Sequence, residues 1–365
     1  MEKNLIIDFN PENLIKNEKE FKRFLSVLAA LEQYTNEGLK EINKMEKDFE
    51  SIGQKYISKL SFNYKDRISR LKEALSHNQN LFNDLIKVYK PSSSYYKNID
   101  LDEINISRFE EGKYIYNVLT YIVRDWTTER QEERKETYNL IIDEVLKFFS
   151  SSSSKKDKKI LIPGSALNRL GYELCKYGFD VDANEYLFLN GIFSDLIFNR
   201  AKKGEFYAYP NIFSFSNYWD EDSVFKKYIF PDVDIDLKNN KDYGKLKLSI
   251  GDFIEQYNKI NEYYDCVITC YFIDTAQNII EYIEIIHNVL KKGGLWINFG
   301  PLSYHWSNCP DSTSIELPYD KLKEVIINYG FEYIKESFKD STFGYIDGNM
   351  HNDFFKCINF SVIKK

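Results

Sequence analysis

The chain has 365 residues, of which 43% are hydrophobic and 16% aromatic, so it can fill a substantial core and is not wholly disordered. Its 49 Lys and Arg residues are outnumbered by 56 Asp and Glu residues, which gives a net charge of −7. This balance disfavours broad binding to a nucleic-acid backbone, because such binding requires a concentrated basic surface. We therefore expect small molecules or basic peptides as partners, and no nucleic acid.

The cysteines and the hydropathy pattern predict a protein of a reducing compartment. The chain begins MEKNLIIDFN, without a basic segment followed by an apolar one, and no uncharged apolar run reaches about 18 residues. We expect no membrane span, and a cytoplasmic location with or without access to the nucleus. The cysteines are odd in number and scattered, unlike a disulfide framework: Cys175, Cys266, Cys270, Cys309 and Cys357.

Residues 1–149 are predicted to form an N-terminal helical region. Between Phe21 and Tyr89 the apolar residues recur at intervals of three and four, as they do along one face of a helix. A further helix is expected at Lys113–Asp125, within which the motif IVRDW begins, and another at Glu133–Phe149. Residues 150–159, SSSSSKKDKK, are polar throughout, so they form either a flexible linker or a solvated loop within one domain.

Residues 160–365 show a different periodicity, in which short apolar strands alternate with amphipathic helices. This alternation predicts an α/β domain with a doubly wound, mostly parallel sheet. The nearly unbroken apolar run YDCVITCYFID is typical of a strand that is buried on both faces. The other expected strands are Ile160–Ile162, Phe179–Ala183, KLKLSIGDF, KKGGLWINFG, Tyr333–Lys339 and Phe354–Lys364, and the expected helices are Leu167–Tyr177, Tyr186–Phe198, Asn278–Leu290 and Tyr319–Tyr329.

The first strand of this domain leads into a glycine-containing turn, ILIPGSALNRLGYEL. In doubly wound sheets the ligand binds beyond the carboxyl ends of the strands, and Gly164 stands at the first such turn. Glu185 lies 21 residues later, just past the second strand, where a carboxylate can accept hydrogen bonds from ribose hydroxyls. The pairing alone is weak evidence, because βαβ units commonly end near an acid.

Two residues of the turn depart from the glycine-rich pattern of a dinucleotide-binding loop. Ala166 adds a methyl group where the backbone would approach a ligand, and Asn168 replaces a third glycine but tolerates a positive φ. Pro163 removes one amide donor. Because a pyrophosphate requires several amide donors, the turn is better suited to a sulfonium amino-acid nucleoside.

Several segments carry a resemblance to a known family. They are ILIPGSALNRLGYEL, NEYLFLNGIFSDLIFNR, FPDVDIDL, GDFIEQY, residues 265–306 and SIELPYDKLKEVIINYGF, together with FKRFLSVLAALEQYTNEGLKEINKMEKDFESI, ALSHNQNLF and IVRDW. They resemble the carnosine N-methyltransferases, a family of class I methyltransferases dependent on S-adenosyl-L-methionine. The resemblance covers nearly the whole chain, and residues 265–306 are its most specific part.

The resemblance implies a Rossmann-like fold with a seven-stranded mixed sheet. The N-terminal helical region would form part of the cofactor lid, and the enzyme would be a homodimer. The implied reaction transfers a methyl group to an imidazole nitrogen of a histidine-containing dipeptide, which converts carnosine to anserine.

The resemblance also implies a set of cofactor-binding residues. Arg124 would bind the carboxylate of the cofactor as a charge-assisted pair, and Glu185 would bind the ribose. Asp252 would accept from the adenine amino group, Phe253 would stack on the adenine or offer its amide, and Cys270 would line the methionine portion. The full set is Arg124, Gly164, Glu185, Asp252, Phe253 and Cys270.

Asp274 and His305 match the family's substrate-facing residues. Asp274 ends the strand in YFIDTA, and His305 stands in SYHW. A neutral imidazole, with a pKa of about 6.5, already offers a lone pair at neutral pH and needs no strong base. A carboxylate that accepts from the other ring nitrogen would fix the tautomer and stabilise the imidazolium as it forms. His305 would orient the polar end of the dipeptide.

The chain departs from the family near its C-terminal end, where the family places tyrosines that meet the dipeptide. The corresponding positions here are Phe343, Asp353 and Phe355. The lost hydroxyls put the identity of the substrate in question more than the methyl transfer. Asp353 is able to bind a cationic amine, so a basic dipeptide or another histidine-bearing peptide is also an expected substrate.

Simpler interpretations stand beside these. Asp274 is also placed to cap the helix that begins near Asn278, and His305 is also consistent with a hydrogen-bonded structural histidine. Cys266 and Cys270 lack further metal ligands nearby, so we expect them to be packing residues and expect no metal. The acids of PDVDIDL lack the glycine and terminal glutamate of a calcium loop, and they are read as loop structure or a pocket rim.

Three other functions remain open on the sequence. In the first, the enzyme uses the same cofactor but methylates another acceptor, such as a histidine in a protein. Alternatively, the fold would be retained as a cofactor-binding pseudoenzyme. A nicotinamide-dependent oxidoreductase is disfavoured, because the turn lacks glycines and no Tyr-x-x-x-Lys proton donor lies beside it.

Overall fold

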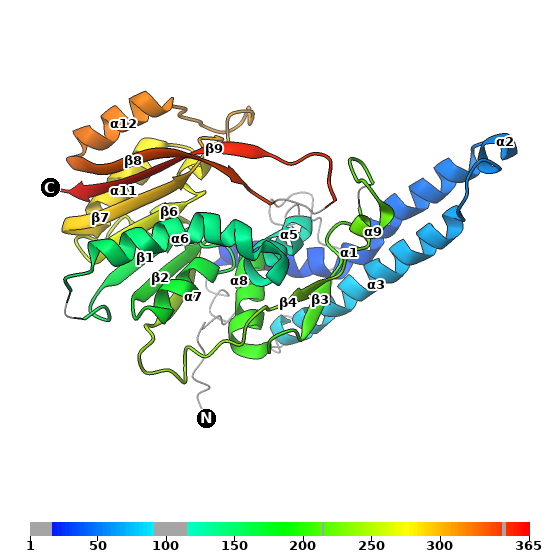
Figure 1. The fold of residues 1–365 in the computed structure, drawn as a ribbon, viewed down its shortest axis with the longest axis horizontal. Helices are drawn as coiled ribbons and strands as arrows, with labels where there is room; N and C mark the ends of the chain where they lie inside the picture. Colours follow the sequence, from blue (N-terminus) through cyan, green and yellow to red (C-terminus); the bar gives the residue numbers. More distant parts are fainter. Residues whose placement is uncertain (1–16, 91–114, 153, 214, 345–347) are drawn as a thin grey trace.

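The structure, a computed structural model, describes residues 17–90, 115–152, 154–213, 215–344 and 348–365. A long antiparallel hairpin is formed by α1 (Glu18–Glu50) and α3 (Tyr64–Tyr89), with the short α2 (Gln54–Ile57) at its tip (Figure 1). The base of the hairpin packs against the rest of the molecule through contacts of α1 with α5 and α8, whereas its tip projects away from the sheet.

Local chemistry explains where the two long helices begin and which parts are buried. The side chain of Asn17 accepts a hydrogen bond from the Glu20 amide, and Asn63 caps α3 in the same way through the Lys65 amide. The apolar stripe predicted from the sequence is buried in the first half of α1. The stripe consists of Phe21, Phe24, Leu25, Leu28 and Leu31, and the helix also buries Val27, Ala29, Ala30 and Tyr34 there.

A seven-stranded mixed sheet forms the centre of the second region, with strand order β5-β2-β1-β6-β7-β9-β8. Strands β5, β2, β1, β6 and β7 run parallel, and β9 pairs antiparallel with both β7 and β8. The expected seven-stranded, Rossmann-like arrangement is therefore confirmed. The strands are β1 (Lys159–Pro163), β2 (Asp180–Glu185), β5 (Leu246–Ile250), β6 (Tyr264–Cys270), β7 (Leu290–Gly300), β8 (Phe331–Thr342) and β9 (Phe354–Lys364).

Helices cover both faces of the sheet, so the central strands are buried on two sides. In β1, Ile160 and Ile162 pack into the core shared with the N-terminal helices, whereas Leu161 packs into the core on the opposite face. The first face is covered by α6 (Gln131–Phe148), α7 (Arg169–Lys176) and α8 (Phe188–Asp195), and the second by α10 (Phe253–Tyr257), α11 (Ile279–Val289) and α12 (Tyr319–Asn328).

An ion network around Asp232 joins the helical region to the sheet domain. Asp232 Oδ1 accepts from Arg169 at 2.6 Å, and Oδ2 accepts from Arg134 at 2.7 Å. The backbone amide of Asp232 donates to the carbonyl of Trp126, the last residue of α5 (Ile115–Trp126). Arg134 also donates to the carbonyl of Arg124 at 2.7 Å. The first acid of PDVDIDL is thus a structural anchor between α5, α6 and α7.

The structure adds elements that the sequence reading did not anticipate and shifts several boundaries. A two-stranded antiparallel ribbon is formed by β3 (Phe206–Ala208) and β4 (Tyr228–Phe230), and a single turn, α9 (Glu221–Val224), lies between them in sequence. Both strands have only three residues, too few to show an alternating pattern. Helix α8 continues into a π-helical turn over Leu196–Arg200. The division of the chain at residues 150–159 stays a prediction.

None of the described helices combines the length and the apolar character needed to cross a membrane.

We predict that Asp232→Asn lowers the free energy of unfolding by about 3 kcal/mol, because it leaves two buried guanidinium groups without their shared carboxylate. Urea denaturation followed by circular dichroism measures this change. The matched control is Asp234→Asn, since Asp234 is exposed and its bond to the Lys203 amide needs only a carbonyl oxygen. The control should change the stability by less than about 0.5 kcal/mol. Equal effects of the two variants would contradict the role of the network.

Candidate functional site

The turn after β1 has an unusual backbone conformation. Gly164, Ala166 and Asn168 have φ values of 65°, 47° and 62°. A Cβ atom on Gly164 would lie 2.4 Å from Cδ2 of Phe272, so both the backbone and the packing require glycine there. The expected tolerance of Asn168 for a positive φ is confirmed. At Ala166 the cost is the left-handed backbone itself, about 1–2 kcal/mol, and not only the steric effect of one methyl group.

Glu185, at the end of β2, is bonded to this turn. Its Oε2 accepts from the Ala166 amide at 2.8 Å and its Oε1 accepts from the Leu187 amide at 2.9 Å. Burial raises the pKa of Glu185, and these backbone donors oppose that rise. The carboxylate therefore fixes the position of the glycine turn relative to the start of α8.

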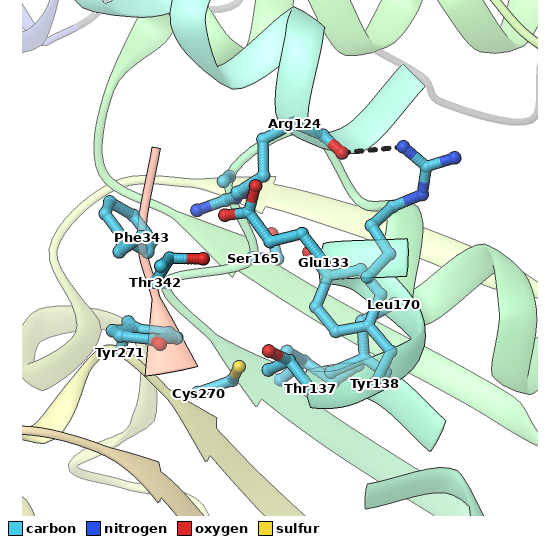
Figure 2. A pocket seen from close by; sticks show the side chains of 14 residues that line it. Arg124, Glu133, Thr137, Tyr138, Ser165, Leu170, Cys270, Tyr271, Thr342 and Phe343 are labelled. Carbon is cyan, nitrogen blue, oxygen red and sulfur yellow. Dashed lines mark hydrogen bonds between the residues drawn. The ribbon is translucent and has the colours of Figure 1, made fainter. Parts of the chain in front are cut away.

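A pocket of about 490 Å³, including its open mouth, lies beside the turn. Figure 2 shows that side chains from α5 and α6 face the ends of β1 and β6 across it, with Thr342 and Phe343 on a third side. Two oxygens that line it, Ser165 Oγ and Glu133 Oε2, are buried and have no hydrogen-bond partner among the described residues. The pocket is lined by Arg124, Glu133, Arg134, Thr137, Tyr138, Ile162, Gly164, Ser165, Ala166, Leu170, Cys270, Tyr271, Thr342 and Phe343.

Arg124 enters this pocket from α5 as a preorganised cation. Its Nε and Nη2 donate to Asp125 at 2.8 and 3.0 Å, and Asp125 also accepts from the Tyr138 hydroxyl at 2.9 Å. Burial is the largest influence and lowers the pKa of Arg124, but the charge and hydrogen bonds of Asp125, together with Tyr138 and Tyr121, outweigh it, so the pKa is raised well above its usual value. The guanidinium also lies 4.8 Å from the centre of the Phe343 ring.

Cys270 closes the inner wall of the pocket at the end of β6 (Figure 2). Burial raises the pKa of its thiol to about 12, so the sulfur stays neutral and offers a polarisable surface. Its strand neighbour Cys266 is fully buried in the core. No group of three His, Cys, Asp or Glu residues in the described ranges is placed to hold a metal ion.

Asp252 and Phe253 follow β5 and do not line this pocket. Asp252 caps α10, since its Oδ1 accepts from the Glu255 amide at 3.0 Å. The Phe253 ring is buried and makes edge contacts with Phe272 and Tyr282, with centroid separations of 5.4 and 5.2 Å. Because the ring packs in the core, the main-chain amide is the group of Phe253 that remains for the expected contact with the adenine.

Asp274 follows β6 and is buried. Its Oδ2 accepts from the Ser303 amide at 2.8 Å, and its carbonyl accepts from the His305 amide at 3.1 Å. Burial raises the pKa of Asp274, while the Ser303 amide and His305 oppose the rise. The structure thus brings Asp274 and His305 together, with the His305 side chain exposed. The cap of α11 is Asn278, so the alternative that Asp274 caps this helix is wrong.

The three residues that stand where the family has tyrosines, Phe343, Asp353 and Phe355, lie in different places. Phe343 lines the pocket and packs against Tyr271 at a centroid separation of 4.6 Å. Phe355 is half-buried in β9, opposite Ser341. Asp353 is exposed, lies 3.5 Å from His351 and is not among the pocket residues.

Sequence reasoning missed the contribution of α6 to the pocket. Glu133, Thr137 and Tyr138 all line it, and the first two are four residues apart, on one face of the helix. The available signal was this polar spacing in EERKETY, five residues after IVRDW. Helical periodicity places these residues on one face but does not say which element that face meets.

The order of the strands, the glycine turn after β1 and the acid that ends β2 define a Rossmann-like domain, the fold in which class I methyltransferases are built. The family model described as carnosine N-methyltransferase matches residues 102–365, more than half of the chain. The chain belongs to the carnosine N-methyltransferase family, and it is a methyltransferase.

Curated relatives support this membership. The mouse protein named carnosine N-methyltransferase is 33% identical over 353 residues, which cover 94% of this chain and 86% of that protein. The Schizosaccharomyces pombe protein of the same name is 32% identical over 319 residues, covering 80% of this chain and 84% of its own. The Dictyostelium discoideum protein of that name is 29% identical over 361 residues, which cover 94% of this chain and 77% of that protein.

Solved structures are more distant. TehB from Haemophilus influenzae is 16% identical, with a TM-score of 0.39, over 61% of this chain and 62% of its own. Magnesium protoporphyrin IX methyltransferase from Synechocystis, solved with bound SAH, is 8% identical, with a TM-score of 0.38. The match covers 64% of this chain and 87% of that protein.

We predict that Gly164→Ala lowers the free energy of unfolding by about 2 kcal/mol, because it adds backbone strain and a clash with Phe272. Ala166→Gly is the matched control in the same turn. It relieves left-handed strain but makes the unfolded chain more flexible, so its net effect should stay within about 1 kcal/mol. Thermal unfolding of both variants measures the difference. A neutral effect at Gly164 would contradict the conformation described for the turn.

Proposed function

We propose that this methyltransferase uses S-adenosyl-L-methionine to methylate an imidazole nitrogen of carnosine or a related histidine-containing dipeptide, giving anserine from carnosine. The observation that carries the proposal is the position of the pocket. It lies at the carboxyl ends of β1 and β6, between the Gly164 turn and Arg124, and the buried Asp274 follows the same strand β6. The sequence similarity to proteins named carnosine N-methyltransferase supports the choice of dipeptide.

The pocket residues fit the amino-acid portion of such a cofactor. Arg124 supplies a fixed positive charge for a carboxylate, and Cys270 supplies an uncharged, polarisable wall. The buried Ser165 Oγ lines the pocket with unused hydrogen-bonding capacity. When bound, S-adenosyl-L-methionine supplies a methyl group activated by a sulfonium. Gly164 would let the backbone turn closely around the ligand. Glu185, the last residue of β2, would receive the ribose, and Asp252, just after β5, would receive the adenine.

Asp274 is the proposed orienting carboxylate for the substrate imidazole. The Ser303 amide holds one of its oxygens and thereby fixes the direction of the group. A carboxylate in this position would accept from one ring N–H, so that the other nitrogen carries the lone pair. Its negative charge would stabilise the imidazolium that forms as the methyl group is transferred. His305, whose backbone is tied to Asp274, would bind the polar end of the dipeptide.

The homodimer and the cytoplasmic location, with or without nuclear access, belong to the same proposal. The five cysteines are unpaired, as they would be in a reducing compartment.

We predict that Asp274→Asn lowers kcat with carnosine by about 100-fold, because the neutral amide cannot stabilise the imidazolium. The affinity for S-adenosylhomocysteine, measured by calorimetry, should change by less than about threefold, since Arg124 and the glycine turn are untouched. Asparagine keeps an oxygen for the Ser303 amide. Asp311→Asn, an exposed residue of the segment after β7, is the control and should leave kcat unchanged. Undiminished turnover of Asp274→Asn would exclude the proposed role.

The proposed acceptor is tested with methyl-labelled S-adenosyl-L-methionine and a panel of carnosine, homocarnosine, histidine and longer histidine peptides. We expect label in carnosine or a related dipeptide, and NMR of the product identifies the methylated ring nitrogen. Label in a longer peptide alone would favour a protein acceptor. Binding of the cofactor without transfer to any acceptor would favour a pseudoenzyme.

A further inference from the structure

Glu133 is a buried carboxylate in the pocket that the roles assigned so far leave unused. It stands on α6, and its side chain is only 10% exposed. Its Oε1 accepts from the Gly344 amide at 3.2 Å. Its Oε2 lies 3.9 Å from Arg130 Nε, beyond hydrogen-bond distance, and has no hydrogen-bond partner in the described ranges.

An ionised oxygen that is buried without a donor is costly, so such a group is usually completed by a ligand, an ion or water. Burial raises the pKa of Glu133, and the nearby charges of Arg124 and Arg130 together with the Gly344 amide lower it. These neighbours offset the effect of burial only in part, so the pKa stays raised and a further hydrogen-bond donor at Oε2 would stabilise the carboxylate. The missing partner is a hydrogen-bond donor on the open side of the pocket.

The other acids near the pocket are already engaged. Asp125 accepts from Arg124 and Tyr138, and Glu185 accepts from the Ala166 and Leu187 amides. Among the residues that line the pocket in the described part of the chain, Glu133 is the single acid.

Arg124 and Glu133 lie side by side at the pocket wall (Figure 2), one on α5 and one on α6. The free amino-acid end of S-adenosyl-L-methionine is a zwitterion, with a carboxylate and an ammonium group both attached to the α-carbon. A cation and an anion presented together match that pair of charges. We propose that Glu133 binds the α-ammonium group of the cofactor through Oε2 while Arg124 binds its α-carboxylate. This inference rests on the proposed use of this cofactor.

The experiment compares two ligands on two proteins by calorimetry, without turnover. The ligands are S-adenosylhomocysteine and its analogue that lacks the α-amino group. The wild-type protein should bind S-adenosylhomocysteine at least tenfold more tightly than the analogue, because only the first ligand forms the charge-assisted bond. Glu133→Gln should lose at least tenfold in affinity for S-adenosylhomocysteine and keep its affinity for the analogue within about twofold.

Glu132→Gln is the matched control, since Glu132 is the neighbouring acid on α6 but is exposed and paired with Lys135. It should retain the wild-type preference between the ligands. Equal losses for both ligands in Glu133→Gln would assign Glu133 a structural role and overturn the inference. A wild-type preference below threefold would overturn it without any variant, even if Glu133→Gln does not fold. Failure of the wild-type protein to bind either ligand would instead overturn the proposed cofactor, and this inference with it.

Discussion

The arrangement of the pocket depends on the shared carboxylate of Asp232. Arg134 comes from α6 and Arg169 from the first turn of α7, and both donate to the same side chain. The Asp232 amide also holds the end of α5, two residues beyond Arg124. One acid therefore sets how the helical region meets the helix that follows the glycine turn. Because all three charges are buried, removing Asp232 would leave Arg134 without its carboxylate and Arg169 with Glu173 alone.

The same principle continues at the pocket and beside it, where neighbouring residues fix the positions of charged groups. Asp125 orients Arg124 through two bonds and is itself oriented by Tyr138. The Ser303 amide orients Asp274. Groups that are held before a ligand arrives need little reorganisation when it binds, which favours a defined ligand geometry. The helical region thus supplies Arg124 and the α6 side chains to the wall of the pocket at the carboxyl edge of the sheet.

Much of the fold could be predicted from the sequence because periodicity reports directly on burial. The nearly unbroken apolar run at residues 264–270 is indeed an inner strand, and the stripe beginning at Phe21 is a buried helix face. The β3–β4 ribbon could not be predicted, since three-residue strands carry too little pattern. The strained φ of Ala166 was also invisible, because alanine gives no sign of a left-handed backbone.

The candidate site could be predicted in part. The positions of Gly164 and Glu185 follow from the βαβ spacing, and the resemblance supplied Arg124, Cys270 and Asp274. The place of α6 in the pocket wall depends on long-range packing through Asp232, which no local pattern records. Asp353 is exposed in the segment before β9 and does not line the pocket. The path of this segment could not be predicted from its local sequence.

The bonds of Glu185 to the Ala166 and Leu187 amides give this acid two duties. Its two hydrogen bonds hold the Gly164 turn in its conformation without any ligand. In the proposed complex, the ribose hydroxyls would share a carboxylate that already accepts two backbone hydrogen bonds. Loss of this side chain would therefore distort the turn even in the protein without ligand.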